Sequence, residues 1–157
     1  APRLTGRIEM AVIQSTFVED LAKGFPGMEA SGELSSIITR TLESASAGFG
    51  KAVYAGTGDS GAVTTPSVRL LGFLIANKGL PVTSSRAADT FITGDNLRIK
   101  NRGAIYVDVA VAVADGEAVY VTPAGLITNA SAGNTAATGW EFLDTLAGAG
   151  VGRIVRR

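Results

Sequence analysis

The sequence contains no cysteine and no histidine among its 157 residues. Without cysteine the chain has no disulfide framework, no thiolate metal site and no thiol nucleophile. Without histidine it lacks the commonest general base and metal ligand, so it cannot form most hydrolase triads or most zinc sites. The composition therefore disfavours an enzyme, and we predict no catalytic, metal-binding or cofactor-binding residue.

The chain also lacks an excess charge of either sign and a long apolar run. Its 14 Lys and Arg residues balance its 14 Asp and Glu residues, so no net charge attracts nucleic acid or an anionic membrane. No run approaches the roughly 18 apolar residues that span a bilayer, and the first residues do not resemble a secretory signal. We expect a protein made in the cytoplasm, with neither nucleic acid nor membrane as a partner.

The clearest pattern in the sequence lies between Gly103 and Val121. Five β-branched residues recur there at every second position, which is the period of a strand with one buried face. They are Ile105, Val107, Val109, Val111 and Val113. Asp115-Gly116 then supplies the residues of a tight turn, and Ala118 to Val121 resumes a β-prone pattern. This stretch predicts a central β-hairpin.

Further short strands are expected at intervals of about ten residues. The apolar spacing of Leu34 to Leu42 also fits a helix, but its residue types favour a strand. The other expected strands are Gly50 to Ala55, Val68 to Ala76, Thr90 to Thr93, Leu97 to Lys100, Leu126 to Thr128 and Gly152 to Val155. Gly72 indicates a bulge or a close backbone approach. Leu97 and Ile99 are expected inward and Arg98 and Lys100 outward, and a polar loop is expected from Asn129 to Gly139. The pattern predicts an all-β fold with a single β-sandwich or jelly-roll-like domain.

Residues 1–23 differ from the rest of the chain. Ile13, Phe17 and Leu21 are spaced by four, with Ile8 and Val12 on a neighbouring stripe, as in a short amphipathic helix. This segment either caps the core of the domain or forms an arm that docks on a neighbouring subunit. We therefore divide the chain into an N-terminal arm or short helix, residues 1–23, and a β domain, residues 24–157.

Two groups of residues are candidates for protein contacts. The apolar group is Ile8, Ile13, Phe17 and Leu21, and the basic group is Arg153, Arg156 and Arg157. The arginines could pair with carboxylates of a partner. A solvated polar tail is the alternative interpretation of the basic group.

Other motifs resemble enzyme or ligand sites but have simpler explanations. Gly56 to Gly61 matches G-x-G-x-x-G, yet Ala62 to Pro66 opens no helix to hold a pyrophosphate. Asp59-Ser60 resembles a trypsin-like nucleophile segment, which requires a histidine. The acidic residues that could serve glycoside hydrolysis fit turns better; they are Asp89, Asp95, Asp108, Asp115 and Glu117. The remaining alternative is a carbohydrate-binding β-sandwich module with a stacking platform, formed by Tyr54, Tyr106, Tyr120 and Trp140.

Three stretches together resemble the tailed-phage capsid cement, or head decoration, protein family. The first is Ile37-Ile38-Thr39-Arg40 followed by Phe49-Gly50-Lys51-Ala52-Val53, which is similar to the family's "FG-x-AV" strand. The second runs from Thr93-Gly94-Asp95 to Val119-Tyr120, and the third from Gly133-Asn134-Thr135-Ala136 through Phe142-Leu143 to Gly152-Arg153-Ile154-Val155. Their order and spacing match from about Gly24 to Val155.

The resemblance implies a small β protein that binds the outside of an assembled phage capsid and resists its internal pressure. It implies the major capsid protein as partner, self-association as a homo-dimer or homo-trimer, a place on the exterior of the virion, and no catalysis or cofactor. The segment before Gly24 departs from the family pattern. The resemblance carries over no attachment residue.

Overall fold

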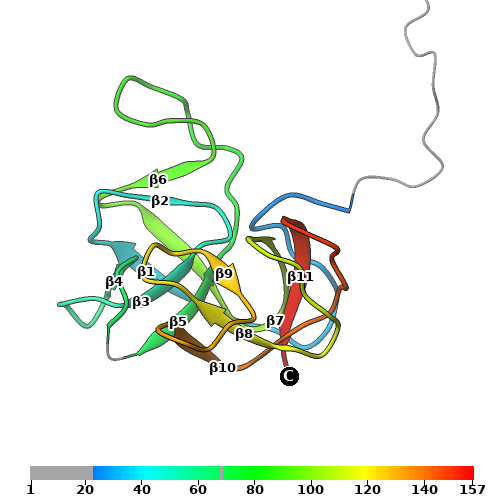
Figure 1. The fold of residues 1–157 in the computed structure, drawn as a ribbon. Helices are drawn as coiled ribbons and strands as arrows, with labels where there is room; N and C mark the ends of the chain where they lie inside the picture. The colour runs from blue at the N-terminus through cyan, green and yellow to red at the C-terminus, as the bar shows by residue number, and fades with distance from the viewer. Residues whose placement is uncertain (1–22, 68) are drawn as a thin grey trace, which may run out of the picture.

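The computed structural model describes residues 23–67 and 69–157, which form eleven strands and no helix (Figure 1). The strands are β1 Ser36–Leu42, β2 Ser46–Gly48, β3 Ala52–Ala55, β4 Gly61–Val63, β5 Leu70–Leu74, β6 Thr90–Ile92, β7 Asn96–Val109, β8 Ala118–Val121, β9 Ile127–Thr128, β10 Thr135–Phe142 and β11 Gly150–Arg156. The all-β prediction is confirmed. The predicted arm or short helix falls on residues 1–22, which lie outside the described residues.

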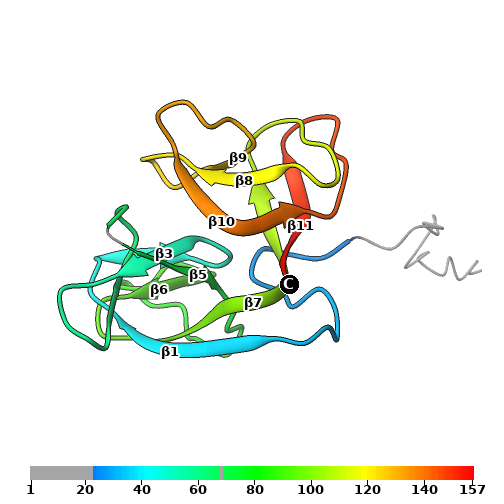
Figure 2. The same ribbon diagram turned by 90° about the horizontal axis from the view of Figure 1, so that it is seen from below.

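The strands close into two five-stranded barrels that share β7. In barrel 1 the order β1-β4-β3-β5-β7 is closed by pairing of β7 with β1. In barrel 2 the order β7-β11-β10-β8-β9 is closed by a parallel pair between Val109 and Ile127. Figure 2 shows the barrels as two lobes, with β7 running from one into the other. The predicted sandwich or jelly roll is therefore replaced by barrels, because one long strand offers its edges to different partners along its length.

The change of partners along β7 occurs at Gly103. Residues 96–102 pair with β1, whereas residues 103–109 pair with β11. Gly103 has a φ of 107°, which residues with a Cβ rarely adopt. A Cβ there would also lie 2.9 Å from the Ser35 Cβ and 3.0 Å from the Lys100 Cε. A glycine thus lets the strand turn from one barrel into the next.

The two barrels pack against each other through β3 and β5, whose residues are buried on both faces. Val53 belongs to the core of barrel 1, whereas Tyr54 belongs to the core that fills barrel 2. Phe73 on β5 meets Trp140 on β10 edge-on, with ring centroids 4.8 Å apart. The shared core makes the two barrels one packed unit.

The segment before β1 covers the free side of β7 in barrel 2. Gly27 N–H donates to the Tyr106 carbonyl, and Tyr106 N–H donates to the Met28 carbonyl. Glu29 then reaches Lys100, with 2.6 Å between Oε1 and Nζ. Lys100 is consequently only 1% exposed, so its predicted outward position was wrong, whereas Arg98 is exposed as predicted.

The predicted central hairpin is also wrong. Gly116 does form a turn with a φ of 88°, but β7 pairs with β11 and β9, and β8 pairs with β10 and β9. Ile105, Val107 and Val109 are buried as the alternation predicts. The alternation specifies which face of a strand is buried, and it leaves the partner at each edge open.

Most of the shorter predicted strands are present. β1 settles the ambiguity of residues 34–42, and β3, β5, β6, β9 and β11 fall within or overlap their predicted ranges. The bulge expected at Gly72 is found as a register shift opposite it, between Val53 and Tyr54. The predicted loop of residues 129–139 is wrong in its second half, because β10 begins at Thr135. Polar and small residues on the outer face of β10 concealed that strand.

Candidate interaction surfaces

The glycine-rich loop of residues 56–61 holds a carboxylate of the protein itself. The backbone N–H groups of Thr57 and Gly58 donate to the two oxygens of Glu43, over 2.8 Å and 3.0 Å. These hydrogen bonds hold the pKa of Glu43 below its usual value. A side chain at Gly61 would collide with the same carboxylate. The loop thus has the geometry of an anion-binding turn, but its anion is internal and serves the structure.

Three of the five acidic residues singled out from the sequence also have structural roles. Asp89 pairs with Lys78, and Asp95 forms a bidentate pair with Arg86. Burial works to raise the pKa of Asp95, but the bonds from Arg86 and from a backbone N–H outweigh it, and the pKa is lowered. Glu117 accepts a hydrogen bond from the Ala114 N–H, closing the turn before β8. Within residues 23–67 and 69–157 no acidic cluster could hold a metal ion.

The aromatic residues do not form the stacking platform that a sugar-binding module needs. Tyr54 and Trp140 are buried in the core shared by the barrels. Tyr106 and Tyr120 are only partly exposed, on β7 and β8 respectively. Two of the four rings are therefore buried in the core and offer no open face for a sugar to stack on, which argues against the alternative function.

The three C-terminal arginines differ in how they are held. Arg153 is bound to Asp144 by its backbone N–H and by its guanidinium, with 2.8 Å between Nη2 and Oδ1. Arg157 lies within 3.0 Å of Glu141 and 3.4 Å of Glu33. Arg156 instead donates to a backbone carbonyl, that of Asn101, over 3.3 Å. The first two thus pair with carboxylates of their own chain, and their contact with a partner stays a prediction.

A free strand edge runs along the first half of β1. β4 pairs only with Thr41 and Leu42 of this strand. Thr41 N–H points to that side, toward the Ser60 carbonyl, whereas Leu42 N–H points back toward β7. By the alternation of a strand, Ile37 and Thr39 direct their N–H and C=O groups away from β7, where no described residue pairs with them. Exposed strand edges of this kind accept another strand.

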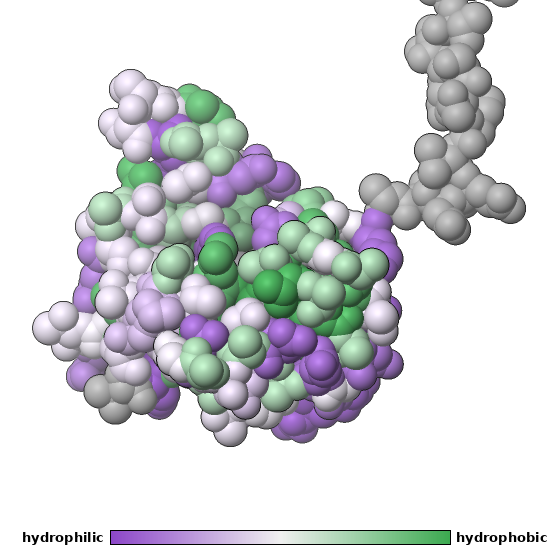
Figure 3. Space-filling model, viewed as in Figure 1, coloured by the Kyte–Doolittle hydropathy of each residue, from purple (hydrophilic) through white to green (hydrophobic). Residues whose placement is uncertain are grey.

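Apolar side chains lie beside this edge and at the far end of barrel 2. Leu34 is 78% exposed and Ile37 is 37% exposed, on the approach to β1 and on β1 itself. Val111, after β7, and Leu126, before β9, are exposed as well. Figure 3 shows hydrophobic surface gathered over the ends of β7, β9 and β11. Both regions have the character of protein contact surfaces.

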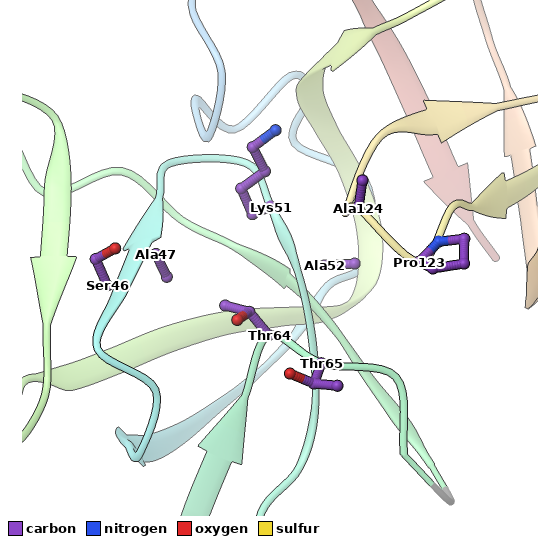
Figure 4. Close-up of a pocket in the computed structure, with 9 residues that line it drawn as sticks. Ser46, Ala47, Lys51, Ala52, Thr64, Thr65, Pro123 and Ala124 are labelled. Carbon is purple, nitrogen blue, oxygen red and sulfur yellow. The ribbon is translucent and has the colours of Figure 1, made fainter.

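Residues of both barrels line several clefts. The first, of about 220 Å³, is formed by β2 to β4 on one side and the turn between β8 and β9 on the other. Figure 4 shows that small side chains line it, among them Ala47, Ala52 and Ala124, and that Lys51 extends away from Thr64 and Thr65. These residues offer little specific chemistry to a ligand.

The second cleft is polar and has a volume of about 280 Å³. Its charged and hydroxyl groups come from both barrels: Ser67 and Arg69 from the segment before β5, Thr135 and Thr138 on β10, and Arg156 on β11. We call it the arginine cleft. Arg156 is one of the contact residues predicted from the sequence, but nothing in the sequence indicates that Arg69 lines the same cleft.

No helix in the described part of the chain is long and apolar enough to cross a membrane.

Comparisons with known proteins identify a family to which the sequence is similar and a solved structure with a similar fold. A family model described as "Structural cement protein (E217 gp24/Pam3 gp6)" matches residues 13–157. A chain in the solved structure "The capsid of Myoviridae Phage XM1" superposes with a TM-score of 0.67 and 16% sequence identity, covering 93% of this chain and 97% of that one. No curated protein sequence matches. The structural similarity at this identity shows a common fold.

Proposed function

Because the chain belongs to the phage structural cement protein family, we propose that it binds the outer surface of an assembled tailed-phage capsid and ties neighbouring subunits of the major capsid protein together. The protein is a structural component of the phage capsid and not an enzyme.

The free edge of β1 is the observation that carries the proposal. Its outward N–H and C=O groups at Ile37 and Thr39 match the hydrogen-bonding needs of an extended segment. Leu34 and Ile37 place apolar surface beside that edge. A strand of a capsid subunit added here satisfies the backbone groups and covers these side chains. Such an addition removes the free edge.

Oligomerisation fits the same role. A cement protein holds a shell by several modest contacts made at once, and a dimer or trimer multiplies those contacts. We propose that the protein is a homo-dimer or homo-trimer, with residues 1–23 as an arm that reaches a neighbouring subunit. Ile8, Ile13, Phe17 and Leu21 are its apolar contacts, and Arg153, Arg156 and Arg157 supply further contacts at the C-terminus.

Sedimentation of the purified protein with undecorated capsid shells tests the proposal. We expect saturable co-pelleting in a fixed ratio to the major capsid protein, and an oligomeric mass for the free protein. A protein that remains in the supernatant at all concentrations contradicts the proposed attachment.

Substitutions on β1 test the role of its edge. Thr39→Pro removes an outward N–H without touching the bonds to β7, whereas Thr39→Val keeps that N–H and serves as the control. We expect the proline variant to bind the capsid about tenfold more weakly. This loss corresponds to one missing hydrogen bond to the added strand and some weakening of the hydrogen bonds next to it. Equal binding by both variants would show that attachment does not use this edge.

A further inference from the structure

The arginine cleft joins the two barrels, and no residue of β1 lines it. Arg69 stands on barrel 1 and Arg156 on barrel 2, and both line the same cavity of about 280 Å³. Trp140, which is packed in the shared core, also contributes to its wall. The cleft is therefore built on the junction of the barrels, where the backbone is held by packing on both sides.

The charge of this cleft is unbalanced. Arg86, Arg153 and Arg157 each lie within 4.0 Å of a carboxylate. Arg69 and Arg156 have no such partner among the described residues, and no Asp or Glu lines the cleft. By contrast, the lysine-lined cleft beside Phe25 also contains Asp89 and Asp108. In the described part of the chain, two guanidinium groups thus share a polar cavity without a counter-charge.

The side chain of Arg156 is positioned by its neighbours. It lies across Gly139, where a Cβ would be 3.3 Å from its Nε, and its Nη1 donates to the Asn101 carbonyl. Its other N–H groups are left for a ligand. The hydroxyls of Thr135 and Thr138 lie in the same cleft.

Guanidinium groups and hydroxyls in this arrangement suit a carboxylate. Arginine binds carboxylates through two parallel N–H bonds, and hydroxyls complete the shell of acceptor oxygens. The volume fits one Asp or Glu side chain with its backbone, and not a folded element. Two arginines in one cavity do not form the extended basic track that a nucleic acid backbone follows, and the chain has no net charge.

We propose that the arginine cleft receives a carboxylate side chain of the major capsid protein, held by Arg69 and Arg156 together. This inference rests on the proposed function, because it assigns the chemistry of one contact with the capsid. Since the two arginines belong to different barrels, the same contact also clamps the barrels to each other.

The test compares two double variants of equal net charge. In Arg69→Gln/Arg156→Gln the arginine cleft loses both charges, whereas Lys51→Gln/Lys78→Gln removes two charges from the separate cleft beside Phe25. Co-pelleting with undecorated shells is titrated at several salt concentrations. We expect the arginine-cleft variant to bind at least about tenfold more weakly with a smaller salt dependence, and the lysine variant to bind within about twofold of the wild type.

The outcomes separate this inference from the proposed function. Wild-type protein that fails to co-pellet refutes both, whereas a cleft variant that binds like the wild type refutes only the arginine cleft. The single variant Arg69→Gln replaces an exposed side chain and so tests the cleft without risk to folding; about threefold weaker binding is expected. Titration with single-stranded DNA gives a further outcome: binding that depends on Arg69 and Arg156 would replace the carboxylate by phosphate as the ligand.

Discussion

The ion pair between Lys100, which is buried, and Glu29, which is exposed, gives the sharpest test of the fold. The two side chains are unequally covered, with 1% of Lys100 and 44% of Glu29 exposed, and 2.6 Å separates Nζ from Oε1. Removing the carboxylate leaves a buried ammonium without a counter-charge. Removing the ammonium leaves a carboxylate that water already reaches. The two single substitutions should therefore have very different costs.

The magnitudes follow from this asymmetry. Breaking a fully buried ion pair on one side costs about 3–5 kcal/mol. Glu29→Gln keeps an amide oxygen that accepts one hydrogen bond, so we expect it to lower the free energy of unfolding by about 2–3 kcal/mol. Lys100→Met keeps the apolar stem and removes the buried charge, so we expect a change of less than about 1 kcal/mol. The double variant should match Lys100→Met within about 0.5 kcal/mol.

Urea unfolding at pH 7, followed by the fluorescence of the single buried tryptophan, measures these differences. With a slope of about 1–3 kcal/mol per molar urea for a small domain, Glu29→Gln should shift the midpoint by about 1 M or more. Additive effects of the two substitutions, or a loss in Lys100→Met as large as in Glu29→Gln, would refute the reasoning.

Acid gives a second readout of the same pair. The hydrogen bond from Lys100 holds the pKa of Glu29 below its ordinary value of 4.5, against the opposing effect of burial. The pair therefore contributes stability above that ordinary value, and the contribution is lost as the pH falls through the lower pKa of the folded state. The difference between the wild type and Glu29→Gln should shrink over that range.

Three further predictions follow from the fold. Gly103 has a φ of 107° and no room for a Cβ, so Gly103→Ala should lower the free energy of unfolding in urea by about 2–4 kcal/mol. Gly116 has a φ of 88° but open space around it, so Gly116→Ala should lower it by about 1–2 kcal/mol. Phe73→Ala removes the ring that meets Trp140 and should cost about 3–5 kcal/mol while leaving a single calorimetric transition. The Arg153 guanidinium lowers the pKa of Asp144, so Asp144→Asn should lower the midpoint of thermal unfolding at pH 7. The difference in midpoint between the wild type and Asp144→Asn should fade as the pH drops below about 3.8, because the folded wild type then takes up a proton at Asp144.

The strands themselves could be predicted from the sequence to a large extent. The alternation that buries Ile105, Val107 and Val109 depends only on neighbouring residues, so it survives any choice of partner strand. The pairing could not be predicted in the same way. β7 takes β1 and β11 as neighbours, from opposite ends of the chain, and a local turn such as that at Gly116 does not compete with them.

In the candidate sites, too, local features could be predicted from the sequence, whereas contacts between distant residues could not. Glu43 explains the glycine-rich motif, but the two lie thirteen or more residues apart and only the fold brings them together. Lys100 has the outward register of an exposed residue, and its burial results from the segment carrying Glu29. The absence of histidine and cysteine can be read directly from the sequence, without knowledge of the fold. Contacts between distant residues have no such local signal.

The shared strand also fixes the order in which the molecule can be completed during synthesis. All strands of barrel 1 lie within residues 36–102, so the ribosome has delivered them before the second half of β7 is made. Barrel 2 needs β10 and β11, the last segments of the chain. Until β10 emerges, Tyr54 and Phe73 on the outer faces of β3 and β5 have no Trp140 to pack against. The nascent first barrel thus presents an aromatic surface that only the C-terminal strands can hide.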